Sequence, residues 1–276
     1  LSRGLGDVYK RQSIYLYIIL KMLIKNFNDL VNILLLLSIL NTSQIIDDSQ
    51  LLNALSELYY QPYPEFSKEA LYFRFPNFDQ FQKPTTTKIA LQVGHLIEQE
   101  LPLELRKLAR GGGAIVNNIK EVDINKNIAY RIKEILERDG YNVDILPAII
   151  PQDYYADVFI ALHANSADEL TSGFMISTPY KDYSQKARKL KKILIQEYQK
   201  ETGLSFINKV TENMTHYYAF NWSRFKRTIH PKTPAVIIEM GNMRNENDLN
   251  ILLNNQDKVA LGIVNAIKIF LSENNN

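Results

Sequence analysis

The pattern of apolar and polar positions becomes regular from about residue 88 onward. Isoleucine and leucine recur at helical spacing in residues 121–140, and Gly140 follows as a helix stop signal. Short apolar runs such as residues 157–163 are typical of buried strands. The pattern predicts further helices over residues 184–203 and 257–271, and strands over residues 88–95, 141–146, 157–163, 173–178 and 235–240.

Strands that alternate with helices indicate the fold class of this region. Such alternation is typical of a mostly parallel, twisted sheet that is covered by helices on both faces. We therefore predict an α/β domain over residues 88–276. The apolar positions of residues 204–233 follow no clear period, which predicts a long loop.

The N-terminal third of the chain follows other patterns. The first twelve residues resemble translated sequencing-adapter read-through, and we treat residues 1–21 as non-native. In residues 22–43 a lysine precedes the apolar run Val31–Leu40, which predicts a signal peptide or a membrane anchor; an ordinary buried helix is the alternative. Residues 44–87 are polar and aromatic by turns, with frequent proline and asparagine, which predicts a linker or an irregular N-terminal extension.

Composition narrows the classes of function. The net charge is +2 and no basic stripe is interleaved with aromatic residues, so we expect no nucleic-acid partner. The chain has no cysteine, which excludes disulfides, thiolate metal ligands and a cysteine nucleophile. A metal site would have to use carboxylates and the four histidines, His95, His163, His216 and His230.

Polar side chains stand at the carboxyl ends of three predicted strands. "IALQVGH" ends in His95, "VFIALH" in His163 and "AVIIE" in Glu239. Open α/β sheets bind ligands at this edge, and an unpaired carboxylate is costly to bury, so core packing explains the pattern poorly. Glu121 begins the first predicted helix and continues its sheet-facing stripe. The helix dipole alone would also favour a carboxylate there.

Two imidazoles and one carboxylate form a recurring catalytic zinc set that leaves one position open for water. His95, Glu121 and His163 match this set and predict one Zn²⁺ per chain. A further residue that is not a ligand should then act as general base for the water. Glu239 matches that role.

Four segments occur in a distinctive order: "QVGH", "KEVDINKNIA", "IALHANS" and "TPAVIIEMGNMRNENDLNIL". With them, the chain from Lys88 to Leu271 resembles the zinc-dependent N-acetylmuramoyl-L-alanine amidases of the Amidase_3 type, which trim bacterial peptidoglycan. In that family the first histidine, the glutamate that opens the helix and the histidine before Ala-Asn bind zinc, and the glutamate after the Pro-Ala-Val strand is catalytic. The resemblance implies these roles for His95, Glu121, His163 and Glu239 respectively.

This chain departs from the family pattern in two places. The family commonly has an Asp-Pro-Gly-His-Gly-Gly turn, whereas residues 92–97 read "QVGHLI". Residues 97–120 form a longer stretch than usual, which contains "ELPLELRKLARGGG". Neither change touches a ligand, but both alter the rim of the expected cleft and with it the substrate preference.

The long stretch itself allows more than one interpretation. Gly111–Gly113 could hinge a lid or form a plain flexible loop. The acidic side chains of Glu98, Glu100 and Glu104 could approach the metal as a self-inhibiting plug or form a solvated helix face.

The resemblance implies an exported enzyme that acts in the cell envelope, in the periplasm or outside the cell. Its reaction would be hydrolysis of the amide bond between N-acetylmuramic acid and L-alanine of the peptidoglycan stem peptide. A zinc peptidase acting on stem peptides is one alternative. A non-catalytic wall-binding or amidase-regulating protein with the same fold is another, and retention of all four polar positions weighs against it.

Further residues are candidates for contact with peptidoglycan. We expect Asn165, which follows the second histidine ligand, to lie near the substrate. Arg224, Arg227 and His230 form a basic loop that could face the carboxylates of a stem peptide, or could simply be solvated. We expect the protein to be monomeric, with membrane anchoring by the N-terminal segment as an option.

Overall fold

The computed structural model describes residues 67–98, 100–110 and 112–274. Most of the described residues, within Glu65–Leu101 and Leu108–Asn276, make up one compact unit, and residues 102–107 belong to a second unit. The segment treated as non-native and the predicted signal peptide or anchor both lie outside the described residues. Within the described part, no helix combines the length and the apolar character needed to cross a membrane.

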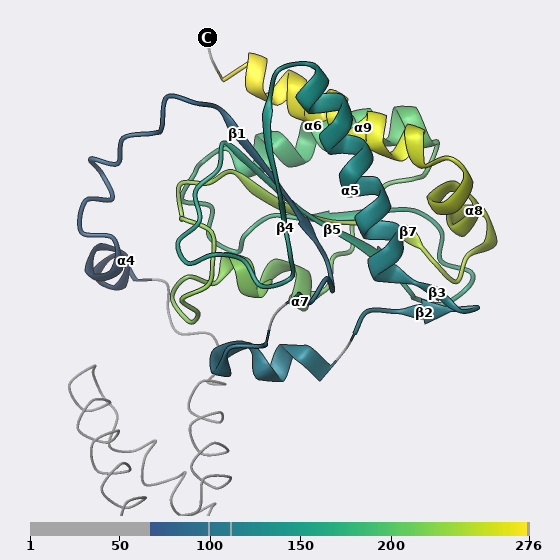
Figure 1. Cartoon of the computed structure of the whole chain (residues 1–276), viewed down its shortest axis with the longest axis horizontal. Coiled ribbons are helices and arrows are strands. Elements are labelled where there is room, and N and C mark those ends of the chain that lie inside the picture. The colour runs from purple at the N-terminus through teal and green to yellow at the C-terminus, as the bar shows by residue number, and fades with distance from the viewer. Residues whose placement is uncertain (1–66, 99, 111, 275–276) are drawn as a thin grey trace, which may run out of the picture. The chain divides into compact units, whose positions relative to one another are not determined.

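A five-stranded sheet forms the centre of the larger unit (Figure 1). Its strand order is β4-β1-β5-β7-β6, and every neighbouring pair is parallel except β6 and β7. The mostly parallel α/β fold predicted from the sequence is confirmed. The strands are β1 (Lys88–Val93), β4 (Asn142–Leu146), β5 (Val158–Asn165), β6 (Met175–Ser177) and β7 (Ala235–Asn242).

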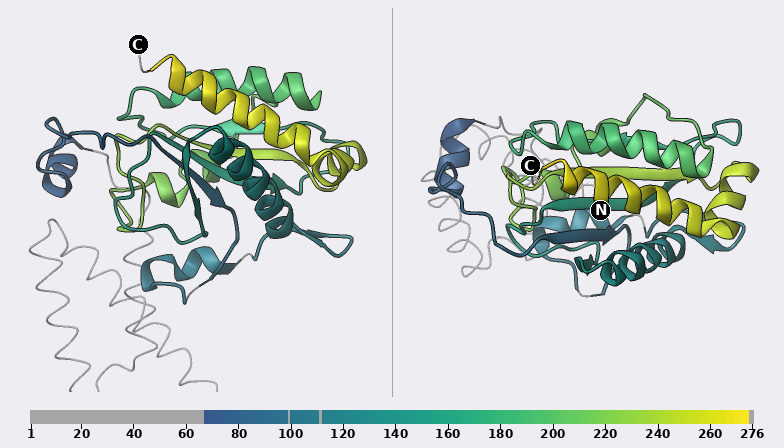
Figure 2. Two further views of the ribbon diagram at one scale, coloured as in Figure 1. Left: turned by 45° about the horizontal axis from the view of Figure 1, so that its top comes forward. Right: turned by 90° about the horizontal axis from the view of Figure 1, so that it is seen from above.

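Three long helices cover one face of the sheet (Figure 2). They are α5 (Glu121–Arg138), α6 (Ala187–Thr202) and α9 (Gln256–Ser272), and the shorter α8 (Glu246–Asn254) precedes α9. Because side chains alternate between the faces of a strand, every second strand residue packs against these helices. The residues buried in this way include Ile89, Leu91, Val93, Val158, Ile160, Leu162, Val236 and Ile238.

Residues 204–234 cover the opposite face with less regular structure. The segment contains α7 (Glu212–Thr215) and the 3-10 helix η2 (Tyr218–Phe220). The ring of Phe220 packs edge-on against Phe159 of β5, with 6.3 Å between the ring centroids. Both faces therefore carry helices, as predicted, but those on this face are short. The odd-numbered residues of β5 and β7, including His163 and Glu239, belong to this second face.

The segment predicted as a linker or an irregular N-terminal extension is partly folded. Ser67 caps α4 (Lys68–Arg74) through a hydrogen bond from the backbone N–H of Ala70 at 3.1 Å. Arg74 at the end of α4 donates to the backbone carbonyls of Trp222, Phe225 and Lys226. Phe75 and Phe78 pack with Trp222 in a small apolar cluster. The folded unit thus begins before residue 88, and at least residues 67–78 are a packed extension rather than a free linker.

The stretch at residues 97–120 ends in a tight hairpin. The helix η1 (Leu103–Arg110) is followed by strands β2 (Ile115–Val116) and β3 (Ile119–Lys120). The two turn residues, Asn117 and Asn118, have φ values of 50° and 65°, the left-handed conformation that two-residue hairpins require. Because β3 runs directly into α5, the hairpin places Glu121 at the start of that helix.

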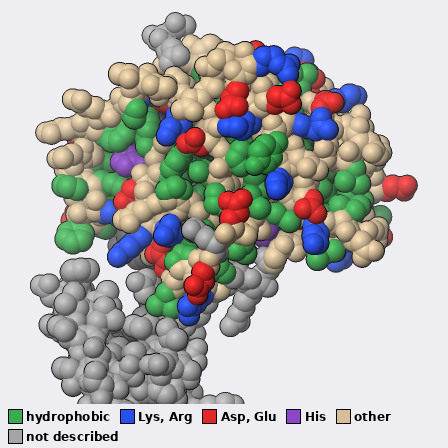
Figure 3. Space-filling model, in the orientation of Figure 1, with side chains coloured by type: hydrophobic (Ala, Val, Ile, Leu, Met, Phe, Trp, Pro, Cys, Tyr) green, Lys and Arg blue, Asp and Glu red, His purple; other side chains and the backbone are tan. Residues whose placement is uncertain are grey.

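Charges of both signs are interspersed on the face of the molecule shown in Figure 3. On α5, Lys133 pairs with Glu137 and Arg138 pairs with Glu134, each at the spacing of one helical turn. Such exposed pairs contribute little to stability, about 0.3–0.5 kcal/mol each. They keep the solvent side of the helix polar while its apolar stripe packs on the sheet.

Candidate metal centre

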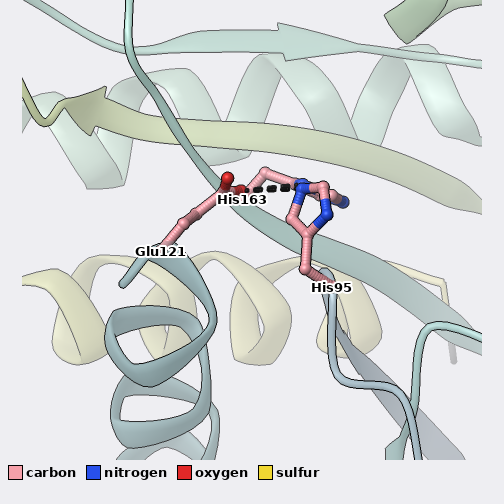
Figure 4. A group of neighbouring side chains, drawn as sticks. All are labelled: His95, Glu121 and His163. Atoms are coloured by element: carbon pink, nitrogen blue, oxygen red, sulfur yellow. Dashed lines mark hydrogen bonds and ion pairs between the residues drawn. The ribbon is translucent and has the colours of Figure 1, made fainter. Parts of the chain in front are cut away.

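Three side chains from separate elements converge at the carboxyl edge of the sheet (Figure 4). His95 follows β1, Glu121 opens α5 and His163 lies near the end of β5. The Oε1 atom of Glu121 lies 3.2 Å from Nε2 of His95 and 3.0 Å from Nδ1 of His163. Among the described residues, these three form the group of His, Asp and Glu side chains that could hold a metal ion. The predicted ligands are therefore brought together.

The donor set and its spacing fit zinc. A tetrahedral Zn²⁺ with bonds of about 2.0–2.2 Å holds its ligand atoms about 3.4 Å apart. The two separations from Glu121, 3.0 and 3.2 Å, are within a few tenths of an ångström of this value, and all the ligand atoms lie within 4.8 Å of one another. Two nitrogens and one oxygen leave the fourth position open, as in catalytic rather than structural sites.

The backbone of His95 is in the left-handed region, with φ at 65°. This conformation is uncommon for residues with a Cβ atom and persists where the surrounding structure holds it. A Cβ atom on Gly113, whose φ is +83°, would lie 3.0 Å from Cγ of His95. One of the three glycines interpreted as a hinge or a flexible loop therefore makes room for a ligand. Glu98 and Glu100, considered as a plug, are exposed and do not belong to the metal group.

The approach of His163 depends on the glycine that precedes His95. A Cβ atom on Gly94 would lie 2.5 Å from Cε1 and 2.6 Å from Nδ1 of His163. Such a contact is too close for any side chain, so the "GH" pair at residues 94–95 lets two strand ends carry imidazoles side by side. The two rings meet edge to face, with centroids 4.9 Å apart.

Glu121 is buried and held by several hydrogen bonds. The backbone N–H of Ala114 donates to Oε2 at 2.9 Å, and that of Ala164 donates to Oε1 at 3.2 Å. Asn125, one turn along α5, donates to Oε1 at 3.4 Å. Burial alone would raise the pKa of Glu121, but hydrogen bonds and charge interactions with His163 and His95 outweigh it and hold the pKa far below its ordinary value. Glu121 is therefore ionised, as a metal ligand must be.

Glu239 lies beside this group without belonging to it. It pairs in register with His163 on the neighbouring parallel strand, so the two side chains share a face at a strand spacing of about 4.8 Å. Its Oε2 atom is closed off from solvent and has no hydrogen-bond partner in the part of the chain described. Burial raises its pKa to about 7, with His163 and His95 opposing the rise and Glu121 adding to it.

The predicted substrate residues lie in different places. Asn165 is at the carboxyl end of β5, where its side-chain oxygen accepts from the backbone N–H of Ser166 at 2.8 Å. Arg224 lies over the ring of Phe225 at 5.2 Å, and Arg227 is half-buried in the same segment. Contact of these three residues with peptidoglycan stays a prediction.

The structure does not bring His230 to the metal centre. His230 precedes β7 and hydrogen-bonds through its backbone to Tyr154, which precedes β5, so it lies at the amino edge of the sheet. Its ring is buried among four aromatic rings, those of Phe75, Phe78, Phe81 and Tyr155. The buried ring rules out the solvated position that was one of the two expectations for His230, and contact of His230 with a stem peptide stays a prediction.

Sequence reasoning missed several residues around the ligands. Tyr217 places its hydroxyl 3.4 Å from Nε2 of His163 and donates to Oε1 of Gln92 at 3.0 Å. Burial raises the pKa of Tyr217 well above its ordinary value, and Tyr218, Glu121 and Glu239 add to the rise. Tyr217 lies in residues 204–233, where the sequence has no periodic pattern that would point to a site residue. Asn125 could have been found, because it stands one helical turn after Glu121.

Comparisons with known proteins agree with this geometry. The family model Amidase_3, described as N-acetylmuramoyl-L-alanine amidase, matches residues 89–269. The matched range contains the three ligand candidates and Glu239. A comparison with curated protein sequences finds no match.

Solved structures of such amidases are similar at low identity. The catalytic domain of CwlV from Bacillus (Paenibacillus) polymyxa var. colistinus is 18% identical, with a TM-score of 0.47, over 68% of this chain and 99% of that chain. CwlD from Clostridioides difficile, in complex with the GerS lipoprotein, is 20% identical, with a TM-score of 0.48, over 68% and 99%. An N-acetylmuramoyl-L-alanine amidase from Clostridium difficile 630 is 15% identical, with a TM-score of 0.49, over 68% and 98%.

The family model covers well over half of the chain, and the side chains within it assemble a group suited to amide hydrolysis. The chain therefore belongs to the Amidase_3 family of N-acetylmuramoyl-L-alanine amidases, enzymes that act on peptidoglycan.

Proposed function

We propose that this chain hydrolyses the amide bond between N-acetylmuramic acid and L-alanine with one zinc ion, held by His95, Glu121 and His163. Glu239 is the general base. The observation that carries this assignment is the register pairing of Glu239 with His163, which sets an unpartnered carboxylate oxygen next to the three converging ligands.

The residues of the chain divide the chemistry between them. When bound, the zinc ion polarises an amide carbonyl and makes water a better nucleophile near neutral pH. Glu239 accepts the proton that the attacking water loses as the new C–O bond forms. It returns this proton to the nitrogen as the C–N bond breaks, so that the products are a carboxylic acid and the free amine of L-alanine.

The supporting residues keep this geometry in place. Backbone N–H groups of Ala114 and Ala164 hold both oxygens of Glu121, so its carboxylate cannot rotate away. Glu239 is on β7, flanked by the parallel strand β5 on one side and by β6 on the other. Groups on rigid elements hold a catalytic geometry better than groups on loops.

Export is a second part of the proposal. It is motivated by the apolar run Val31–Leu40 behind Lys25, and by the location of peptidoglycan outside the cytoplasmic membrane. A fusion of residues 22–60 to a reporter that is active only outside the cytoplasm should give signal. A reporter that stays in the cytosol would contradict export by this segment.

Digestion of purified sacculi by the full chain tests the reaction. Mass spectrometry of the products should find stem peptides with a free N-terminal L-alanine beside intact N-acetylmuramic acid. Cleavage within or between stem peptides would instead establish a zinc peptidase. Binding to sacculi without any released product, from protein loaded with zinc, would indicate a non-catalytic wall-binding protein.

A further inference from the structure

A chain of hydrogen bonds connects the metal centre to the loop after β4. The hydroxyl of Tyr217 lies 3.4 Å from Nε2 of His163, on the side of the ring away from Glu121. The same hydroxyl donates to Oε1 of Gln92 at 3.0 Å. The amide nitrogen of Gln92 donates to the backbone carbonyl of Ala148 at 3.1 Å. Gln92, in the middle of this chain, is completely buried, at 0% exposure.

The direction of each hydrogen bond follows from the fixed end of this chain. A backbone carbonyl can only accept, so the Nε2 atom of Gln92 must face Ala148 and its Oε1 atom must face Tyr217. The amide oxygen is also only an acceptor, so the single proton of Tyr217 points to Gln92. The phenolic oxygen is then an acceptor toward His163, whose Nε2 atom must carry the ring proton. A metal-bound imidazole is neutral and carries a single ring proton, so the Nδ1 atom, which faces Glu121, then offers its lone pair to the metal.

We propose that Tyr217 and Gln92 are positioning residues that hold His163 in the Nε2–H tautomer and so present Nδ1 to the metal. The ring of Tyr217 supports the same orientation, because it packs edge-on against the imidazole with centroids 5.7 Å apart. The inference rests on the proposed zinc site. Partners of this kind fix the tautomer of metal-binding histidines, and their loss typically costs about 10–100-fold in metal affinity.

This arrangement suits the glutamine that this chain has in its "QVGH" turn. The related amidases commonly have aspartate three residues before the first histidine ligand, where this chain has Gln92. An ionised carboxylate can only accept hydrogen bonds and could not donate to the carbonyl of Ala148. A glutamine both donates and accepts, which allows one neutral buried side chain to connect Ala148 with Tyr217.

The tautomer of His163 in the wild-type chain is the direct test. Long-range ¹H–¹⁵N NMR correlations of the zinc-loaded full chain should show His163 with a protonated Nε2 and a metal-bound Nδ1. A protonated Nδ1 with the metal on Nε2 would overturn the proposal. This measurement needs no variant, so it decides the question even if a substituted chain fails to fold.

A matched pair of variants tests the hydroxyl. Tyr217→Phe removes the bond to His163 and keeps the ring, and zinc affinity from chelator competition should fall about 10–100-fold. Tyr218→Phe is the control. It removes a hydroxyl that accepts from Gln92 at 2.9 Å and donates to Ala148, and it leaves in place the hydrogen bonds from Gln92 to Ala148, from Tyr217 to Gln92 and between Tyr217 and His163. Its zinc affinity should equal that of the wild type.

The outcomes separate this inference from the proposed function. A wild-type chain that binds no zinc would contradict the metal site itself. A wild-type chain that binds zinc, together with Tyr217→Phe of equal affinity, would overturn only the role of Tyr217. Equal losses in Tyr217→Phe and Tyr218→Phe would mean that the loop acts through general packing, which also overturns it.

Discussion

Two histidines at opposite edges of one sheet are buried to nearly the same extent, and they have different surroundings. His163 is 8% exposed and His230 is 7% exposed. His163 has the carboxylate of Glu121 and the hydroxyl of Tyr217 at its two ring nitrogens. Aromatic rings surround His230, and its Nδ1 atom accepts from the backbone N–H of Lys232 at 3.2 Å. Burial alone therefore does not distinguish a ligand from a core residue.

The surroundings also set the charge of each site. Burial lowers the pKa of His230 to about 4, with Lys232 and Arg74 adding to the effect and Asp153 opposing it, so the ring is neutral over most of the pH range. At the carboxyl edge, the neighbouring imidazoles keep Glu121 ionised despite its burial. The carboxyl edge of the sheet thus concentrates polar groups around a candidate cation site. At the amino edge, the imidazole of His230 packs as an aromatic ring in the core.

The largest effect should come from the base at the carboxyl edge. Glu239→Gln preserves volume but cannot accept a proton, so turnover should fall by about 10²–10⁴-fold. Zinc content and melting temperature should stay near those of the wild type, because Glu239 is not in the ligand group. Loss of zinc in this variant would make Glu239 a ligand, and unchanged turnover would mean that another group takes the proton.

Packing at the same edge should be sensitive to a single methyl group. Gly94→Ala would press a Cβ atom against the ring of His163, and we expect a loss of about 3 kcal/mol in the free energy of unfolding together with weaker zinc binding. Gly112→Ala is the control, since a Cβ atom there meets nothing within 4 Å. Urea unfolding of both variants measures the difference in their free energies of unfolding. Equal stability of the two variants would contradict the close approach of the His163 ring to Gly94.

The amino edge should respond to loss of the N-terminal extension's anchor. Arg74→Ala removes a guanidinium that hydrogen-bonds three backbone carbonyls and pairs with Asp153. Stability should fall by about 2 kcal/mol, because hydrogen bonds to charged groups are among the stronger ones. Arg138→Ala, which breaks an exposed pair on α5, should cost at most about 0.5 kcal/mol. If thermal unfolding finds similar losses of stability in Arg74→Ala and Arg138→Ala, the hydrogen bonds of Arg74 do not anchor the N-terminal extension.

The pH dependence of stability should reveal the neutral imidazole of His230. Between its folded pKa of about 4 and its ordinary value of 6.5, the unfolded chain binds more protons than the folded chain. The free energy of unfolding therefore rises with pH across this window, and this contribution is lost as the pH falls through about 4. His230→Phe, which keeps an aromatic ring in place, should flatten the curve between these values. An unchanged slope would mean that His230 does not titrate differently on folding.

The same comparison shows what sequence reasoning could find. The ligands and Glu239 were predictable because apolar strands that end in polar residues all deliver those residues to one edge. Closeness in sequence to the catalytic strand does not place His230 near the metal centre. His230 precedes the strand, and the five residues from Ala235 to Glu239 alone span about 13 Å.

Other features left no periodic signal. Tyr217 belongs to an irregular segment whose position is set by tertiary packing and by hydrogen bonds to Gln92. The helix α4 has only seven residues, too few for an apolar stripe to emerge, and the aromatic residues after it pack against side chains far away in the sequence, such as Trp222. Patterns of period two or 3.6 describe regular elements, so side chains supplied by irregular chain are found only in three dimensions.

Zinc content of the purified full chain tests the central claim most directly. The wild type should carry close to one equivalent of zinc, and His230→Phe should carry the same amount because its ring is far from the ligands. The double variant His95→Ala/His163→Ala should lose the metal, since it keeps only one member of the ligand group. Atomic absorption after extensive dialysis gives the three values. Stoichiometric zinc in the double variant, or its loss in His230→Phe alone, would contradict the account.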